Sequence, residues 1–337
     1  MSASAAGIVR RSLLYVPSSS SRMLAKSLHL NSDNITYDLE DSVAPHQKPA
    51  ARALLTAHLA HLSSDAPAWP TPTEVCARIN PVNSPHALAD IAAVAGSQRL
   101  DALLVPKVSS AADLTFVTDV LRHVCPARHP PLSDPAASTA NAQPLPHRPP
   151  IKLIALIESA RAITDLREIC TASPYLSGLV FAAEDFALDL SLTRTPALTE
   201  FLYARSAIVT AARAFNLPSV IDLVCTEYKG EAGQARLREE CENGRGMGFN
   251  GKQCIHPSQV GLVQELFAPP KADLEWAARV TIANAKAEAQ DRGAWTLDGK
   301  MIDAPVVGKA QALLKRGAQC GINIELIKDQ WKNQLPE

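Results

Sequence analysis

The stretch NITYDLEDSVAPHQKPAARALLTAHLAHL, residues 34–62, contains a complete strand–turn–helix unit. Its first five residues, NITYD, form a short, apolar-leaning run that is typical of a strand. Residues 50–62 are rich in alanine and leucine and have the periodicity of a helix. Three acids occupy four positions where the strand ends and the turn begins, Asp38, Glu40 and Asp41. So much negative charge is unexpected where a buried strand leaves the core, and it needs an explanation of its own.

Strand-like runs of this kind alternate with longer helical patterns along most of the chain. There are eight of them: SLLYV (12–16), NITYD (34–38), EVCARI (74–79), DALLV (101–105), IKLIALI (151–157), GLVFA (178–182), SVIDLV (219–224) and NGKQCI (250–255). Eight strands that are each followed by a helix predict an α/β protein with a (β/α)8 TIM-barrel fold. A doubly wound sheet is the alternative, but it would not readily use eight such units.

The same pattern sets the expected domain limits. We expect the barrel to span residues 10–268 and a C-terminal helical extension to span 269–337, where it could pack on a neighbouring subunit. One segment, 126–150, interrupts the alternation, because it holds eight of the chain's 25 prolines and almost no large apolar residues. This composition predicts a surface loop or a disordered insertion in the barrel.

Composition and charge exclude several classes of function. The formal net charge is −1, which gives no indication of a nucleic-acid partner or an anionic membrane surface. Seven cysteines are scattered without a CxxC pair, which argues against a disulfide framework and structural zinc. No apolar run approaches the roughly 20 residues that cross a bilayer. The segment MSASAAGIVRR resembles a transit peptide only weakly, so we expect a cytoplasmic or mitochondrial protein without a clear targeting signal.

Polar groups follow nearly every predicted strand, at the end where a TIM barrel forms its active site. They are Asp38, Glu40, Asp41, Arg78, Lys107, Glu158, Glu184, Asp185, Asp222 and His256. Each has a structural explanation when taken alone. Glu158 and Asp185, for example, are favoured in the first turn of a helix by its dipole. Several acids on one rim would nevertheless repel one another without a cation, so their shared position predicts an oxygen-ligand site for Mg²⁺, with Mn²⁺ as an alternative.

Successive blocks of the sequence resemble the HpcH/HpaI aldolase and citrate lyase beta-subunit superfamily. They are RRSLLYVPSSSSRML, YDLEDSVAP, ARINPVNSP, LLVPKVSSAADL, ALIESARAI, FAAEDFALDL and GFNGKQCIHPSQV. Their order and spacing match over about residues 10–315, although FAAED replaces a commoner glycine-containing form. Within the superfamily, GKQCIHP and the later GKMIDAP resemble the stand-alone citrate lyase beta-like proteins of the citramalyl-CoA lyase type more than the subunit of the bacterial citrate lyase complex.

The resemblance implies a barrel with one divalent metal, assembled as a homotrimer or a multiple of trimers. By motif match, Glu158 and Asp185 are the metal ligands, and Arg78 contacts the carbonyl or thioester oxygen of the substrate. By the same match, Asp38, Glu40 and Asp41 form an acidic cluster that would orient metal-bound waters and neighbouring side chains. The negative charge of the opening stretch would thus belong to a magnesium site.

Three further residues take roles from the resemblance. Arg22 and Lys26 match positions that hold the phosphates of coenzyme A. Asp303 matches a C-terminal catalytic acid/base that, in the citrate lyase beta-like proteins, reaches the barrel of a neighbouring subunit. From its sequence context alone, Asp303 is the N-cap of a helix with Pro305 in its first turn.

The implied reaction is Mg²⁺-dependent cleavage of a 3-hydroxy-3-carboxyacyl-CoA into acetyl-CoA and a 2-oxo acid, or the reverse condensation. Citramalyl-CoA is the expected substrate, followed by malyl-CoA and then citryl-CoA. One alternative is a class II aldolase acting on a free hydroxy-oxo acid, which would not need Arg22 and Lys26. Another is a non-catalytic barrel subunit, which would tolerate changes at Glu158 and Asp185.

Overall fold

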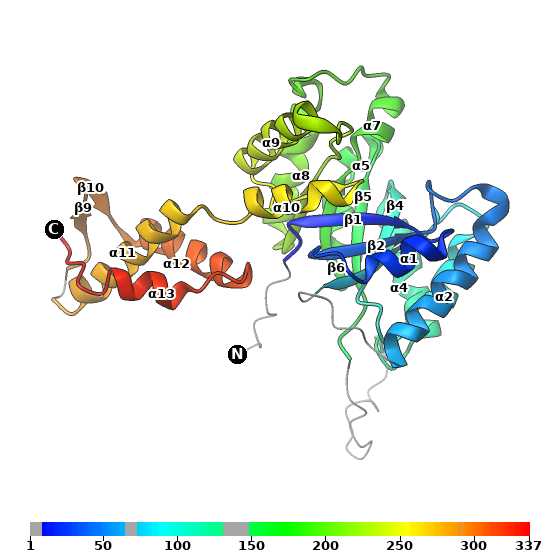
Figure 1. Ribbon diagram of the computed structural model, residues 1–337, viewed down its shortest axis with the longest axis horizontal. Helices are drawn as coiled ribbons and strands as arrows, with labels where there is room; N and C mark the ends of the chain where they lie inside the picture. Colours follow the sequence, from blue (N-terminus) through cyan, green and yellow to red (C-terminus); the bar gives the residue numbers. More distant parts are fainter. Residues whose placement is uncertain (1–8, 65–72, 131–147, 291) are drawn as a thin grey trace, which may run out of the picture. The chain divides into compact units, whose positions relative to one another are not determined.

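The computed structural model describes residues 9–64, 73–130, 148–290 and 292–337. Of the predicted proline-rich insertion, residues 131–147 lie outside the described residues, as do residues 1–8 of the N-terminal segment. The chain divides into two compact units (Figure 1), a barrel unit over Arg10–Val263 and a C-terminal unit over Gln264–Glu337. Helix α10 (Pro257–Phe267) contains the boundary between them.

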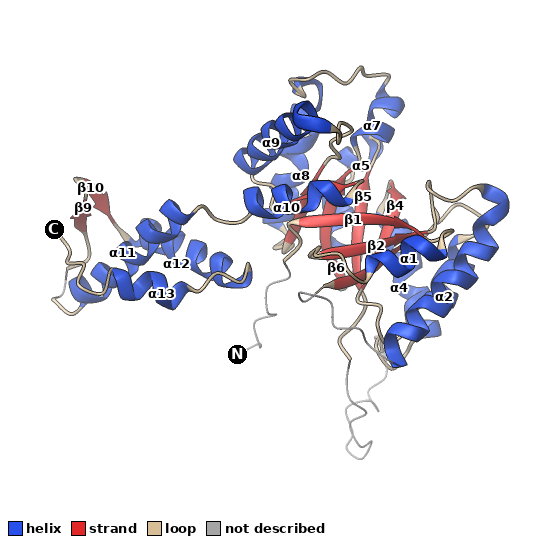
Figure 2. Ribbon diagram, in the orientation of Figure 1, coloured by secondary structure: helices blue, strands red, loops and turns tan. Residues whose placement is uncertain are grey.

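Eight parallel strands form a closed barrel in chain order, which confirms the predicted (β/α)8 fold. They are β1 (Ser12–Pro17), β2 (Asn34–Asp38), β3 (Glu74–Arg78), β4 (Ala102–Val108), β5 (Lys152–Ile157), β6 (Leu176–Phe181), β7 (Ser219–Asp222) and β8 (Gly251–Cys254). The ring closes where β1 pairs with β8, with Leu13 opposite Gln253. Figure 2 shows the strands at the centre of this unit and the helices outside them.

Helices follow every strand of the barrel. They are α1 (Ser21–Ser27), α2 (Lys48–Ser64), α3 (Ala87–Val94), α4 (Ala111–Val124), α5 (Ala160–Thr164), α6 (Leu166–Thr171), α7 (Ala183–Leu190), α8 (Leu202–Ala214), α9 (Gly230–Met247) and α10. Several begin at a side chain that satisfies their free N–H groups, as Ser20 does for α1 and Ser159 for α5. The turns after β1 and β5 are therefore stabilised by local sequence.

Small and branched side chains fill the interior of the barrel. They come from alternate strand positions and include Leu13, Cys76, Ala102, Leu104, Ile154, Leu156, Val180 and Ile221. Because successive side chains of a strand point to opposite faces, the next inward position after Leu13 is Tyr15, which packs against this cluster. The packed interior closes the barrel below its carboxyl-end mouth, where the polar groups begin.

The C-terminal unit has its own hydrophobic core. Its elements are α11 (Lys271–Glu288), β9 (Trp295–Leu297), β10 (Lys300–Ile302), α12 (Ala304–Gln319) and α13 (Ile324–Gln330), with β9 and β10 antiparallel. Leu274, Ala277, Trp295 and Ile302 are among its buried residues. Asp303 is the N-cap of α12, and its Oδ1 accepts a hydrogen bond of 3.2 Å from the backbone N–H of Val306.

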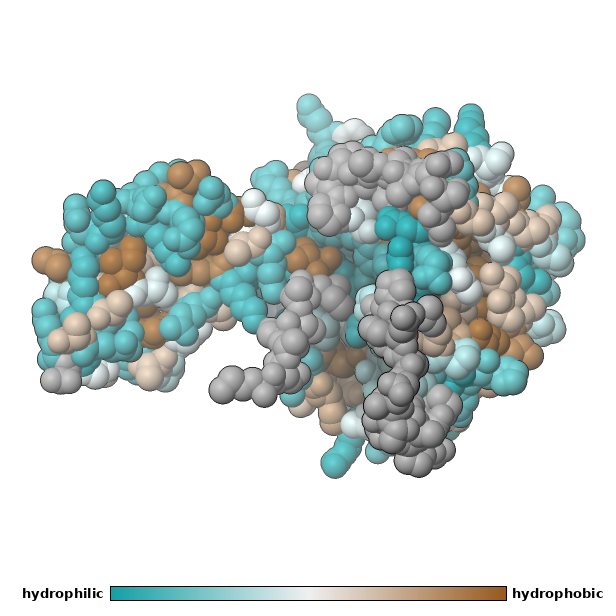
Figure 3. Space-filling model, turned by 90° about the horizontal axis from the view of Figure 1, so that it is seen from below, coloured by the Kyte–Doolittle hydropathy of each residue, from teal (hydrophilic) through white to brown (hydrophobic). Residues whose placement is uncertain are grey.

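The outer surface mixes polar and apolar residues. Figure 3 shows hydrophilic and hydrophobic residues interspersed on the visible face of each unit. Within the described residues, no helix combines the length and the apolar character needed to cross a bilayer.

The closure of the barrel makes one glycine indispensable. Gly251 begins β8, and a Cβ atom at this position would lie 1.9 Å from the carbonyl oxygen of Arg10. We expect Gly251→Ala to lower the free energy of unfolding by more than about 3 kcal/mol, because the backbone must move for the side chain to fit. The control is Gly261→Ala in α10, where nothing lies within 4 Å of the added methyl group. Urea unfolding of both variants tests this, and equal stabilities would contradict it.

Candidate active site

Arg78, the last residue of β3, is at the centre of the acidic cluster. Its Nε and Nη2 each donate a hydrogen bond of 2.7 Å to the carboxylate of Asp38. Its Nη1 lies 2.8 Å from Glu40 Oε2 and 3.2 Å from Asp41 Oδ2. Strand register creates this arrangement, because Asp38 is opposite Arg78 in the β2–β3 ladder. Three of the guanidinium N–H donors thus form hydrogen bonds with carboxylates, and the contact with Glu40 is an ion pair.

The acidic turn after β2 is held in place by its own backbone. Asp38 accepts hydrogen bonds from the N–H groups of Glu40 (2.8 Å) and Ser42 (3.0 Å). The buried ammonium group of Lys48 donates to the carbonyl oxygens of Leu39 (2.9 Å) and Glu40 (2.7 Å). Burial alone would raise the pKa of Asp38, but the hydrogen bonds and charge of Arg78 hold that pKa below its ordinary value. The Asp38 carboxylate is therefore ionised at neutral pH and fixes the arginine.

Lys107 brings the acids of three other loops together. Its backbone has a positive φ of 51°, rare for a residue with a side chain, and lies within a register shift of β4. Its N–H is 3.2 Å from Glu158 Oε1. Its Nζ is 3.1 Å from Asp185, 3.7 Å from Glu40 and 3.9 Å from Glu158. The carboxylates at the ends of β2, β5 and β6 thus converge on one lysine.

At this mouth of the barrel, the acidic side chains outnumber the basic side chains that contact them. Five carboxylates, those of Asp38, Glu40, Asp41, Glu158 and Asp185, contact the two cations Arg78 and Lys107. Burial raises the pKa of Glu40 to about 8, in opposition to the charge of Arg78. Burial together with the charge of Asp185 raises the pKa of Glu158 to about 7. Both shifts indicate a site that an additional cation would stabilise.

The donor set suits a hard divalent cation. The oxygens of Glu40 are buried and, among the described residues, have ion-pair contacts but no hydrogen-bond partner. Within the same ranges, no three acidic, histidine or cysteine side chains form a ready-made metal cage. Mg²⁺ commonly binds through one or two carboxylates and keeps several waters. Glu158 and Asp185 therefore fit the two protein ligands of such an ion, with Glu40 beside them.

Two residues on the wall of the mouth were missed from the sequence. The hydroxyl of Tyr15 donates to Gln253 Oε1 at 2.8 Å, and Gln253 Nε2 donates to the carbonyl oxygens of Phe181 (2.9 Å) and Asp222 (3.2 Å). The guanidinium of Arg78 lies over the Tyr15 ring, 4.7 Å from its centre. Burial raises the pKa of Tyr15, so its hydroxyl stays protonated. The alternation of SLLYV was the available signal, since it places Tyr15 on the same face as Leu13.

The expectation that Asp222 belongs to this mouth is wrong. Its carboxylate receives hydrogen bonds of 3.0 and 2.6 Å from Arg205 of α8, and both side chains are buried. The side chain also lies against Gly244 of α9. It therefore points outward, toward the helices, because its strand position is on the outer face of the barrel.

Three other predicted residues are exposed on the barrel unit, and the fourth belongs to the C-terminal unit. Arg22 and Lys26 are exposed on α1. His256 is exposed, stacks on Tyr228 with ring centres 4.9 Å apart, and contacts the hydroxyl of Ser258 through Nδ1 at 2.8 Å. Asp303 belongs to the C-terminal unit. The roles of Arg22, Lys26 and Asp303 therefore stay predictions.

Asp38 and Asp41 form a matched pair, because both contact Arg78 but only Asp38 is buried. Their side chains are 1% and 59% exposed. We expect Asp38→Asn to lower the free energy of unfolding by about 3 kcal/mol at pH 7, and Asp41→Asn by less than about 1 kcal/mol. Because the folded-state pKa of Asp38 is depressed, its contribution is present above the ordinary pKa of 3.8 and is lost as the pH falls through the folded-state pKa.

Urea unfolding of wild type and both variants between pH 7 and pH 3 measures these differences. A gap between wild type and Asp38→Asn that persists unchanged at the acidic end would contradict the assigned ion pair. So would equal losses for the two variants at pH 7.

Comparisons with known proteins agree with this architecture. Residues 11–257 match the HpcH/HpaI aldolase/citrate lyase family. The citrate lyase subunit beta of Haemophilus influenzae is 35% identical, over 94% of this chain and 99% of that protein. The mitochondrial citramalyl-CoA lyase of Homo sapiens is 32% identical, over 90% and 84% of the two chains.

A solved structure also resembles this chain over most of its length. The protein CitE of Mycobacterium tuberculosis, in complex with magnesium, acetoacetate and coenzyme A, has a TM-score of 0.66 and 28% identity, over 92% of this chain and 98% of that one. With the family match, the two relatives and the closed barrel, the conclusion is direct: the chain belongs to the HpcH/HpaI aldolase/citrate lyase family.

Proposed function

We propose that the protein is a Mg²⁺-dependent carbon–carbon lyase. It cleaves a 3-hydroxy-3-carboxyacyl-CoA into acetyl-CoA and a 2-oxo acid, or catalyses the reverse condensation. The observation that carries this proposal is the convergence of Glu40, Glu158 and Asp185 beside the fixed guanidinium of Arg78. The ligands named for the M. tuberculosis relative, magnesium, acetoacetate and coenzyme A, support it.

Citramalyl-CoA is the first-choice substrate, followed by malyl-CoA and citryl-CoA. The identities of 35% to a citrate lyase beta subunit and 32% to a citramalyl-CoA lyase do not separate these subgroups. The blocks GKQCIHP and GKMIDAP favour the stand-alone type. The expected assembly is a homotrimer or a multiple of it.

Glu158 and Asp185 would hold the metal at the mouth of the barrel. When bound, Mg²⁺ supplies Lewis-acid polarisation of the hydroxyl and carboxylate oxygens of the substrate and neutralises the surrounding acids. Asp38 keeps the neighbouring guanidinium in a fixed plane through its two 2.7 Å hydrogen bonds. Lys107 donates to Asp185 and Glu158 and so orients both carboxylates.

In the cleavage direction, the hydroxyl oxygen loses its proton and forms the carbonyl of the 2-oxo acid. The bond between this carbon and the methylene carbon of the acetyl group breaks, and its electron pair enters the thioester as an enolate. The guanidinium of Arg78 would stabilise the enolate oxygen, a contribution of about 3 kcal/mol for donors of this kind. A proton delivered to the methylene carbon completes acetyl-CoA, so the overall change moves one proton from oxygen to carbon.

Asp303 is the proposed source of that proton, and it would remove the same proton in the condensation. Its carboxylate already accepts the N-cap hydrogen bond of α12, which is a sufficient structural reason for its presence. Asparagine is an equally good N-cap. Asp303→Asn therefore separates the catalytic role from the structural one.

We expect wild-type protein with Mg²⁺ to convert one of these three acyl-CoA thioesters to acetyl-CoA and the matching 2-oxo acid. Glu158→Gln should reduce kcat/KM at least about 100-fold, and Asp303→Asn should reduce kcat by about 100-fold or more, the usual contribution of a general acid. Chromatography with mass detection identifies both products. Free coenzyme A in place of acetyl-CoA would indicate thioester hydrolysis and would contradict the lyase.

The matched control is Glu168→Gln, an exposed acid on α6, which should leave the rates unchanged. Full activity of Asp303→Asn would restrict that residue to capping. Cleavage of a free hydroxy-oxo acid without any thioester activity would favour the aldolase, and no metal-dependent activity at all would favour the non-catalytic barrel.

A further inference from the structure

Arg194, in the loop that follows α7, connects three elements of the barrel unit. Its Nη2 lies 2.9 Å from Glu240 of α9 and donates at 3.0 Å to the carbonyl oxygen of Val224, just after β7. Its Nη1 forms an ion pair with Glu184 in the first turn of α7. The side chain is 17% exposed, so these contacts are formed largely out of water and hold it in a single position.

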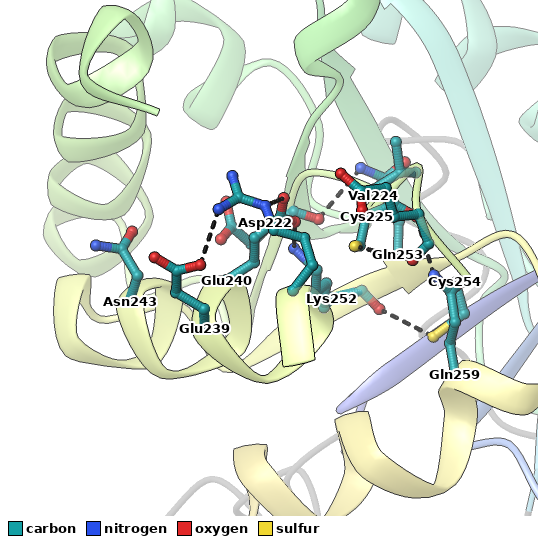
Figure 4. Close-up of polar contacts among 12 residues, drawn as sticks. Asp222, Val224, Cys225, Glu239, Glu240, Asn243, Lys252, Gln253, Cys254 and Gln259 are labelled. Atoms are coloured by element: carbon teal, nitrogen blue, oxygen red, sulfur yellow. Dashed lines mark hydrogen bonds and ion pairs between the residues drawn. The ribbon is translucent and has the colours of Figure 1, made fainter. Parts of the chain in front are cut away.

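The inner end of this connection is a fully buried ion pair. Lys252 of β8 and Glu240 of α9 are 0% and 2% exposed, with 3.0 Å between Nζ and Oε2. Figure 4 shows both side chains in one polar cluster with Asp222. A buried carboxylate of this kind must keep its cationic partners, because separation leaves an uncompensated charge. Glu240 is therefore a rigid anchor for Arg194.

The outer end of the connection reaches the candidate metal site. Glu184, which Arg194 holds, is directly followed by Asp185, whose carboxylate lies 3.1 Å from Lys107. Adjacent residues of a helix point about 100° apart, so fixing Glu184 on one side sets the direction of Asp185 on the other. The N-cap of α7, Ala182, provides no side-chain hydrogen bond. The orientation of this first turn thus depends on tertiary contacts.

The same turn is also linked to the loop that carries the other candidate ligand. The N–H of Ala182 donates at 3.1 Å to the carbonyl oxygen of Ile157, the residue before Glu158. Asp189, four residues after Asp185, accepts a 2.8 Å hydrogen bond from the N–H of Ala160. These contacts join α7 to the loop after β5 at Ala182 and at Asp189, and Arg194 adds the contact at Glu184, beside Asp185.

We propose that Arg194 is a positioning residue of the metal site, which sets the carboxylate of Asp185 relative to that of Glu158 through its ion pair with Glu184. The inference rests on the proposed function, in which Glu158 and Asp185 hold a divalent cation. Within the described ranges, the contacts of Arg194 are with Glu184, Glu240 and the carbonyl oxygen of Val224, and so not with the two ligands themselves.

The test is the affinity of the full chain for Mg²⁺ and Mn²⁺, measured without substrate by titration calorimetry. We expect Arg194→Gln to weaken both affinities by 10- to 100-fold, as for other residues that orient metal ligands. Arg236→Gln is the matched control. Arg236 also contacts Glu240, at 3.2 Å, and is 14% exposed, but its other contacts are Glu239 and the carbonyl oxygen of Pro196 and not α7. It should leave metal affinity unchanged.

A second variant keeps the test valid if Arg194→Gln fails to fold. Glu184→Ala removes the outer end of the ion pair from a side chain that is 53% exposed, so it should fold normally and still weaken metal binding several-fold. The double variant should bind metal no more weakly than Arg194→Gln alone, because both changes remove one interaction.

The outcomes separate the two proposals. Wild-type affinity in Arg194→Gln or Glu184→Ala would overturn the positioning role while the metal site stands. Equal weakening by Arg194→Gln and Arg236→Gln would also overturn it, because general loosening around Glu240 would then be the cause. A wild-type protein that binds neither cation would remove the metal site and this inference with it.

Discussion

The bidentate ion pair between Arg78 and Asp38 is the interaction on which the arrangement of charged groups at the mouth of the barrel depends. Both groups are nearly buried, and the β2–β3 register places them opposite each other. Without this arginine, the carboxylates of Asp38, Glu40 and Asp41 would repel one another in a region of low polarity. The pair costs desolvation energy, so its value lies in geometry more than in stability. It presents a planar cation at a fixed place beside the remaining acids.

The chemistry proposed for this site requires groups that do not move as charge develops. The contacts of Lys107 and Lys48 serve that requirement in different ways. Lys107 uses a positive φ and a register shift to bring its N–H and Nζ to the loops after β5 and β6. Lys48 donates hydrogen bonds to the backbone carbonyl oxygens of Leu39 and Glu40 in the acidic turn. The acids are thus held in place by backbone and lysine contacts before any substrate arrives.

Much of this architecture could be predicted from the sequence. The eight strands were found within a few residues of their observed bounds, because short apolar runs and the turns that end them are local features. The rule that barrel strands carry the active site at their carboxyl ends then brought Arg78, Glu158 and Asp185 to one region. The same rule failed for Asp222, because it locates the end of a strand but not the face on which a side chain lies.

By itself the sequence determined the fold class, the family resemblance and the charged residues at the strand ends. Each of these depends on order and spacing along the chain. Only the tertiary structure decided which side chains point into the mouth, that Tyr15 and Gln253 form part of its wall, and that Lys107 joins three acids. It also revealed the line of contacts from Lys252 through Arg194 to Glu184. The reason is physical: these contacts join residues up to hundreds of positions apart, and strand register and barrel closure bring them together.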